Sequence, residues 1–197
     1  MGDENKMWVF VRRLKPFFII VSLHGLFPTP KGGFGWYAYQ EGVFPSTADF
    51  QTPVTAIAEL CANLPHNPSF ANADFSSCHW MGFSQGAAVI FMLGLTHPSL
   101  TQSLVGFAGY LPNAALPLCE SLPLAGIPIF VSHGTKDQIV PMQRSRQTVQ
   151  LLTLAGANLT YCVSSCNHQA SLGCLKDVET FLRANINLPI KEQAYAN

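Results

Sequence analysis

Residues 78–96 read CHWMGFSQGAAVIFMLGLT, and this stretch decides the expected fold. Its first part is a short apolar run that predicts a buried strand, and its second part has apolar residues at helical spacing. Ser84 therefore stands on a tight turn from strand to helix, between Gly82 and Gly86. Small residues are needed at these two positions because larger side chains would collide across the turn. In this context the G-x-S-x-G pattern favours a nucleophilic serine over a plain glycine-rich turn.

The same alternation of strands and helices continues along the chain. The predicted strands are Phe17–Leu23, Cys78–Phe83, Leu104–Phe107, Ile127–Ser132 and Asn158–Val163. The predicted helices are Pro53–Leu64, Gln85–Thr96, Met142–Ala155 and Leu172–Ile186, and Gly156 is the expected C-cap of the third. This order predicts an α/β fold, with a mostly parallel twisted sheet and helices on both faces. We expect one domain over residues 1–197, with 1–15 as a peripheral strand or flexible segment and 188–197 as a flexible tail.

The amino-acid composition limits the kinds of binding partner expected for this chain. Charged residues make up 11% of the chain, below the average of about 25% for soluble proteins, while apolar residues make up 48%. This balance implies an extensive core or an apolar binding surface, and it allows a homodimer. The 11 basic residues offset the 11 acidic ones and form no long run, so nucleic acid is not an expected partner.

Two further residues complete a candidate catalytic set with Ser84. Asp137 follows the predicted strand Ile127–Ser132 on a short loop, and His168 follows the predicted strand Asn158–Val163. Open parallel sheets place their sites beyond the carboxyl ends of the strands, where these side chains can meet. A serine hydroxyl is a weak nucleophile until an imidazole takes its proton, and a carboxylate holds that imidazole in one tautomer. The alternative for Asp137 is a simple loop cap.

The cysteines and the N-terminal region bear on compartment and cofactors. We interpret the six scattered cysteines as mostly reduced thiols, although a local disulfide or metal site near His168 is an alternative. No paired C-x-x-C motif supports zinc. The apolar run Phe17–Leu23 is too short to span a membrane and is interpreted as a strand rather than part of a signal peptide, so a cytoplasmic location is expected.

Taken together, these pieces resemble the phospholipase/carboxylesterase family, which includes acyl-protein thioesterases and small bacterial esterases. The segments that carry the resemblance, in the family's order, are Leu23–Gly25, Gly35–Tyr37, Gly82–Gly86, Gly109–Pro112, His133–Asp137, Val140–Pro141 and His168. The resemblance implies the α/β-hydrolase fold, with Ser84, Asp137 and His168 as the triad. It also implies an oxyanion hole made by the backbone N–H groups of Gln85 and Leu26, with no metal or organic cofactor.

The sequence departs from the family pattern after its first strong strand. Leu26 is followed almost at once by the segment that contains Trp36, where family members place a helix and another strand. We therefore expect a fold shortened by one strand–helix unit. A second departure is Asn167 before His168, where the family commonly has glycine; asparagine tolerates the left-handed conformation better than most residues do.

The implied function is a serine carboxylesterase that hydrolyses short-to-medium acyl or aryl esters through an acyl-enzyme on Ser84. A shortened segment beside the site would leave it open, which favours small esters. One alternative is an acyl-protein or acyl-CoA thioesterase or lysophospholipase, and another is a non-catalytic binding module. The candidate pocket residues, which share an apolar character, are Leu26, Phe27, Phe34, Trp36, Tyr37 and Leu111.

Overall fold

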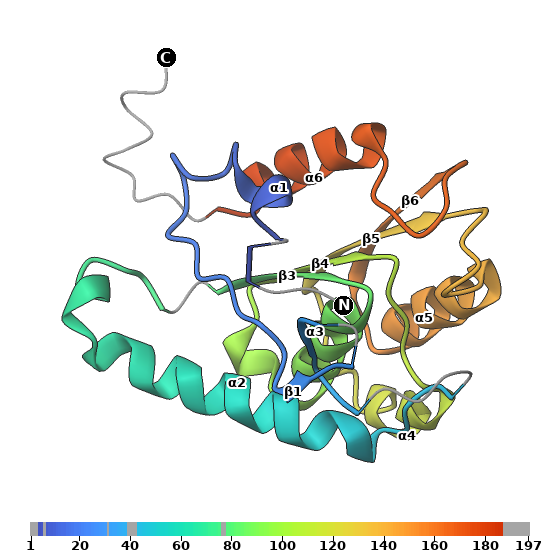
Figure 1. The fold of residues 1–197 in the computed structure, drawn as a ribbon, viewed down its shortest axis with the longest axis horizontal. Helices are drawn as coiled ribbons and strands as arrows, with labels where there is room; N and C mark the ends of the chain where they lie inside the picture. Colours follow the sequence, from blue (N-terminus) through green and yellow to red (C-terminus); the bar gives the residue numbers. More distant parts are fainter. Residues whose placement is uncertain (1–3, 6, 31, 39–42, 76–77, 187–197) are drawn as a thin grey trace.

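A four-stranded parallel sheet forms the centre of the computed structural model (Figure 1), which describes residues 4–5, 7–30, 32–38, 43–75 and 78–186. The strands are β3 (His79–Phe83), β4 (Ser103–Phe107), β5 (Pro128–Gly134) and β6 (Asn158–Ser164). They lie in chain order, and each pairs with the next in parallel. The carboxyl ends of all four strands therefore meet at one edge of the sheet, and β3 and β6 are its two outer strands.

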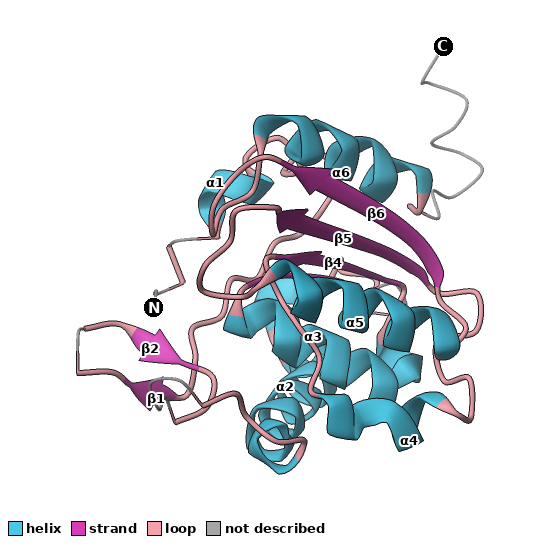
Figure 2. Cartoon of the chain, turned by 90° about the vertical axis from the view of Figure 1, so that its right-hand side faces the viewer, coloured by secondary structure: helices cyan, strands magenta, loops and turns pink. Residues whose placement is uncertain are grey.

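Helices cover both faces of this sheet (Figure 2). On one face lie α2 (Gln51–Asn63), α3 (Gln85–Thr96), α4 (Leu116–Cys119) and α5 (Met142–Leu154), and on the other lie α1 (Trp8–Val11) and α6 (Leu172–Ala184). Short 3-10 helices occur at Ala48–Phe50, Leu64–His66, Pro68–Phe70, Pro98–Leu100 and Asn113–Ala115. Successive strand side chains point to opposite faces, so the sheet has a separate apolar core on each side.

The structure confirms the α/β fold and most of the predicted elements. Four of the five predicted strands and all four predicted helices are present, with ends that differ by at most two residues. Gly156 follows the end of helix α5 as the expected capping residue, and its φ of 88° is left-handed. The next residue, Ala157, donates to the carbonyl of Leu152, which closes the helix with a Schellman motif. The strands, helices and helix cap with strong local sequence signals are therefore present in the folded protein.

The prediction of a strand at Phe17–Leu23 is wrong. Residues 18–25 form neither helix nor strand, although the segment keeps a two-residue burial period. Phe18 and Ile20 pack into the core beside α6, whereas Ile19 and Val21 are 57% and 43% exposed. An apolar run favours burial, but a strand also needs a neighbour that matches its backbone hydrogen bonds, and this segment makes no such ladder with β3.

The predicted N-terminal strand is also absent from the described part of residues 1–15, where α1 and turns stand instead. The predicted tail, 188–197, lies outside the described residues. Where the strand–helix unit was expected to be missing, the chain forms a small antiparallel ribbon of β1 (Phe27–Pro28) and β2 (Phe34–Gly35). This ribbon brings the chain directly from Gly25 to Trp36.

Candidate active site

Ser84 occupies the sharp turn between β3 and α3. Its φ of 53° is uncommon for a residue other than glycine, and the turn is held by a 2.8 Å hydrogen bond from its N–H to the carbonyl of Phe107 on β4. A Cβ on Gly82 would lie only 2.4 Å from the backbone of Gly86, so the strand and the helix approach too closely for a side chain at that position. The turn raises Ser84 above the carboxyl end of the sheet, with the first N–H groups of α3 beside it.

Ser84, His168 and Asp137 form one hydrogen-bonded line, although they come from three separate loops. The Ser84 hydroxyl lies 2.9 Å from Nε2 of His168, and Nδ1 of His168 lies 2.8 Å from Oδ2 of Asp137. A carboxylate can only accept hydrogen bonds, so Nδ1 carries the proton and Nε2 is left to accept from the serine. The His168 side chain is 20% exposed and that of Asp137 is fully buried, so a substrate can reach the imidazole but not the acid.

Backbone groups fix the second oxygen of Asp137. Oδ1 accepts from the N–H groups of Ile139 and Val140 at 2.9 and 2.8 Å, so the loop turns around the carboxylate. The buried His133 donates from Nε2 to the carbonyl of Val140 at 2.8 Å and lies 3.5 Å from Asp137. Burial lowers the pKa of His133, which favours a neutral imidazole in this position.

The loop that carries His168 is tied to the loop that carries Asp137. Thr135 and Lys136 donate backbone hydrogen bonds to the carbonyls of Ser164 and Cys166 at 2.8 and 3.0 Å. A Cβ on Gly134 would lie 2.3 Å from the carbonyl oxygen of Cys166, so glycine is required for this approach. The pairing of the two loops places base and acid together.

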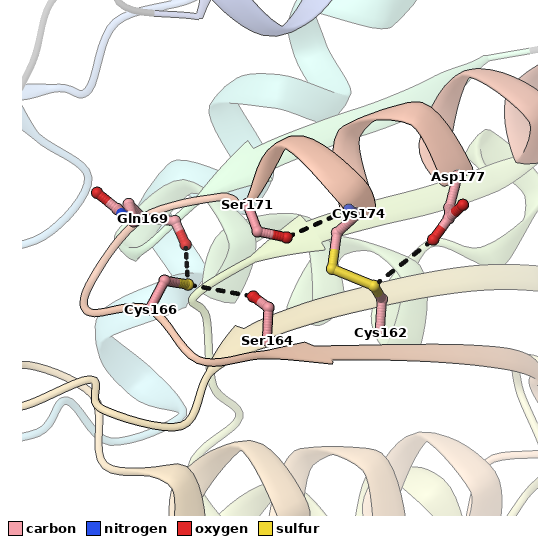
Figure 3. The surroundings of a disulfide bond; sticks show 7 residues. All are labelled: Cys162, Ser164, Cys166, Gln169, Ser171, Cys174 and Asp177. Atoms are coloured by element: carbon pink, nitrogen blue, oxygen red, sulfur yellow. Dashed lines mark hydrogen bonds between the residues drawn. A yellow bond between two sulfur atoms is a disulfide. The ribbon is translucent and has the colours of Figure 1, made fainter.

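A disulfide closes the same His168 loop (Figure 3). It joins Cys162 on β6 to Cys174 on α6, with the two Cα atoms 5.9 Å apart. Cys61, Cys78, Cys119 and Cys166 are free thiols. The interpretation of the cysteines as mostly reduced thiols therefore holds for four of the six, and the alternative of a local disulfide near His168 applies to Cys162 and Cys174.

The two expected oxyanion donors occupy different settings. Gln85 is the first residue of α3, so its N–H belongs to the turn beside Ser84. Leu26 lies in the loop before β1, with 41% of its surface exposed. The backbones of Gly25 and Gly35 touch, since a Cβ on Gly25 would lie 2.3 Å from the carbonyl of Gly35. The position of Leu26 therefore depends on the segment that follows β2.

The candidate pocket residues divide into two groups by burial. Leu26 and Phe27 are exposed, and Phe34 and Trp36 are partly buried. Tyr37 and Leu111, by contrast, are 8% and 0% exposed and belong to the core on the α3 face. Core packing leaves these last two almost no surface to offer a ligand.

Nothing in the sequence indicated the role of the Gln85 side chain. A local disulfide near His168 was one of the alternatives that the sequence left open, and the i,i+4 spacing of His133 and Asp137 pointed to their contact. No group of three or more His, Cys, Asp or Glu in the described ranges is arranged to hold a metal ion. Within those ranges, too, every helix is too short or too polar to cross a bilayer.

Comparisons with solved structures agree with this fold. The solved structures most useful for comparison are a Bacillus cereus carboxylesterase, with a TM-score of 0.81 and 19% identity over 94% of this chain and 84% of that one, and a Mesorhizobium loti carboxylesterase, with a TM-score of 0.79 and 20% identity over 92% and 83%. At this level of identity the likeness establishes the fold.

Curated relatives match over shorter stretches. Acyl-protein thioesterase 1 of Schizosaccharomyces pombe is 38% identical over 72 residues, which is 36% of this chain and 32% of the relative. Acyl-protein thioesterase 1 of Gibberella zeae is 29% identical over 109 residues, or 53% and 46%. The matches thus span 32% and 46% of these relatives' lengths. The family model described as Phospholipase/Carboxylesterase, however, matches residues 2–186, and the chain belongs to that family.

Proposed function

We propose that this protein is a serine hydrolase that cleaves carboxylic esters through an acyl-enzyme on Ser84. The observation that carries the proposal is the line of hydrogen bonds from Ser84 through His168 to the buried Asp137. The strained backbone of Ser84 at the start of α3 supports the same role, since strain at such a turn is maintained where it serves function. Membership of the phospholipase/carboxylesterase family points to this chemistry as well.

In the proposed mechanism His168 removes the hydroxyl proton of Ser84 as its oxygen attacks the ester carbonyl. Asp137 stabilises the imidazolium that forms and keeps its Nδ1 proton in place. The backbone N–H groups of Gln85 and Leu26 donate to the oxyanion of the tetrahedral intermediate. His168 then protonates the leaving alcohol, and in the second half it activates the water that hydrolyses the acyl-enzyme.

The burial of Tyr37 and Leu111 supports a preference for short-to-medium acyl or aryl esters. These residues fill the core, so the proposed acyl site consists of Leu26, Phe27, Phe34 and Trp36 at the surface. An open apolar surface contacts a short chain or a flat ring well but leaves most of a long chain in water. A single domain, a cytoplasmic location and a possible homodimer remain expectations from the sequence.

Hydrolysis of p-nitrophenyl esters from acetate to palmitate tests the proposal. The wild type is compared with Ser84→Ala and with Ser121→Ala. The second variant removes an exposed hydroxyl that takes no part in the triad. We expect turnover of the short esters by the wild type and by Ser121→Ala, and background rates with Ser84→Ala. Equal rates for the wild type and Ser84→Ala on every ester would favour the non-catalytic binding module.

Thioester hydrolysis is a second candidate, because the curated relatives are named acyl-protein thioesterase 1. The proposed triad attacks both substrate types by the same route. Kinetics with an ester and a thioester of the same acyl chain separate them: a higher kcat/KM for the thioester would assign the thioesterase activity. If the ester is the better substrate, carboxylesterase activity is assigned.

A further inference from the structure

The side chain of Gln85 is partly buried and connects two parts of the chain. Its Oε1 accepts a 3.0 Å hydrogen bond from the backbone N–H of Trp36, just after β2. The amide also lies close enough to the Tyr37 hydroxyl to oppose the rise that burial causes in the pKa of that group. Trp36 and Tyr37 belong to one segment, so the Gln85 side chain ties that segment to the start of α3.

The far end of this connection is rigid. The hydroxyl groups of Tyr37 and Tyr110 lie 2.5 Å apart, and the Tyr37 ring packs edge-on against Phe50 at 5.3 Å between ring centroids. Burial raises the pKa of Tyr37, while the hydrogen bonds with Tyr110 and Gln85 oppose that rise. Tyr37 therefore stays protonated and fixes the segment against the core on the α3 face.

The near end of the connection reaches the expected oxyanion loop. Gly35 lies against the Gln85 amide, since a Cβ there would be 3.1 Å from Oε1. On its other side Gly35 touches Gly25, where a Cβ would lie 2.3 Å from the Gly35 carbonyl. These backbone contacts have no flexible side chain to absorb movement, so a shift of Gly35 moves Gly25 and Leu26 with it.

The segment 18–25 forms no ladder with β3, so the only strand pairing beside Leu26 in the described residues is that of the small ribbon, in which Phe27 pairs with Gly35. We propose that the Gln85 side chain is a positioning group that holds the Leu26 N–H in the oxyanion hole, acting through Trp36, Gly35 and Gly25. In this arrangement Gln85 donates to the oxyanion through its own backbone and sets the second donor through its amide. The inference rests on the proposed hydrolase function.

Gln85→Met tests the inference, because methionine keeps the length of the side chain and the backbone N–H but removes the amide that accepts from Trp36 and interacts with Tyr37. Displacing one oxyanion donor should lower kcat on short p-nitrophenyl esters by about 10- to 100-fold, somewhat less than removing it outright. KM should stay within about twofold, because the contact forms in the transition state. Gln150→Met makes the same exchange at an exposed position of α5 and should leave both constants unchanged.

The inhibition constant of a trifluoromethyl ketone with a hexyl chain tests the oxyanion hole directly, so it distinguishes a displaced donor from a general loss of structure. The ketone adds to an active-site serine and leaves an oxyanion in the hole, so its inhibition constant should rise by the same factor as kcat falls. The pH midpoint of kcat/KM should not move, because the contacts of His168 are unaltered. Tyr37→Phe, which removes one buried oxygen, should lower kcat in the same direction but less, and it decides the question if Gln85→Met does not fold.

The outcomes separate the two proposals. If the wild type hydrolyses the esters and Gln85→Met and Tyr37→Phe both keep the wild-type kcat, the positioning role is overturned. The hydrolase function then still stands. A fall in kcat without a matching rise in the inhibition constant would also overturn the positioning role. If the wild type is no faster than Ser84→Ala, the proposed function fails and the positioning role fails with it.

Discussion

Nε2 of His133 donates to the carbonyl oxygen of Val140 at 2.8 Å, and the N–H of Val140 in turn donates to Asp137 at the same distance. The buried imidazole therefore closes the loop that holds the acid. Its Nδ1 is buried with no hydrogen-bond partner among the described residues. A protonated imidazole would leave a second donor, Nδ1–H, unpaired in the core, which explains why the neutral form suits this position.

Protein stability should fall in mild acid because of His133. Burial lowers its pKa and outweighs the hydrogen bond to Val140 and the charge of Asp137, which both raise it, while His168 adds to the lowering. Below about pH 6.5, the ordinary histidine pKa, the unfolded chain binds a proton at this residue while the folded chain does not. The stabilisation is therefore complete above that pH and is lost as the pH falls below it. Burial lowers the pKa of His79 as well, with the same sign. Urea unfolding measured between about pH 8 and 5, on both sides of that ordinary pKa, tests this. Below about pH 6.5 the free energy of unfolding should fall by up to about 1.4 kcal/mol per pH unit for each histidine.

Two variants locate the source of this pH dependence. His133→Gln removes one titrating group and should reduce the slope below about pH 6.5, leaving the part that comes from His79. His66→Gln makes the same change at an exposed position and should not alter it. Equal slopes for the wild type and His133→Gln would show that His133 is not the group responsible.

Asp137→Asn should separate loop structure from catalysis. The asparagine carbonyl can still accept from Ile139 and Val140, so the free energy of unfolding should change little. Its NH2 group would face Nδ1 of His168 and favour the wrong tautomer, which should lower kcat by about 10⁴-fold. Asp137→Ala should lower both kcat and stability, because two buried N–H groups lose their acceptor. Wild-type kcat in Asp137→Asn, measured on the same ester, would exclude Asp137 from the mechanism.

Gly82→Ala should disrupt the turn at Ser84. The new Cβ would lie 2.4 Å from the backbone of Gly86, so β3 and α3 must move apart, at a cost of about 1–3 kcal/mol. Gly173→Ala is the matched control on α6, where the nearest atom is 4.0 Å away, and it should stabilise the helix by up to about 1 kcal/mol. Thermal unfolding and ester hydrolysis measure both effects; a Gly82→Ala protein with wild-type stability would contradict the close approach.

Reduction of the Cys162–Cys174 disulfide should loosen the loop that carries His168. The bond closes a short loop between β6 and α6, and removing it should lower the free energy of unfolding by about 3 kcal/mol. The measurement compares chemical unfolding with and without dithiothreitol, and in Cys174→Ala.

Cys61→Ser serves as the control, since burial raises the pKa of the Cys61 thiol to about 11 and keeps it unreactive. Identical unfolding curves with and without reductant would mean that the two thiols are not joined in solution. That result would suit the expected cytoplasmic location, where structural disulfides are rare.

The sequence by itself determined the elements whose signals are local. Ser84 was identified because an apolar strand, two glycines and a helical pattern are adjacent in the chain, and the α/β fold followed from repetition of that unit. The order of Ser84, Asp137 and His168, each after a different strand of the sheet, was enough to predict that they meet. Parallel strands gather their carboxyl ends at one edge, whatever the details of the loops.

The tertiary structure alone decided the contacts between loops. Whether Phe17–Leu23 forms a strand depends on a backbone ladder with β3, and whether Leu111 lines a pocket depends on what packs over it. The bond from Trp36 to Gln85 joins segments 49 residues apart, and no local propensity predicts it. Local patterns state what each residue prefers, but a hydrogen bond or a packed surface needs two partners, and only the folded chain selects the second.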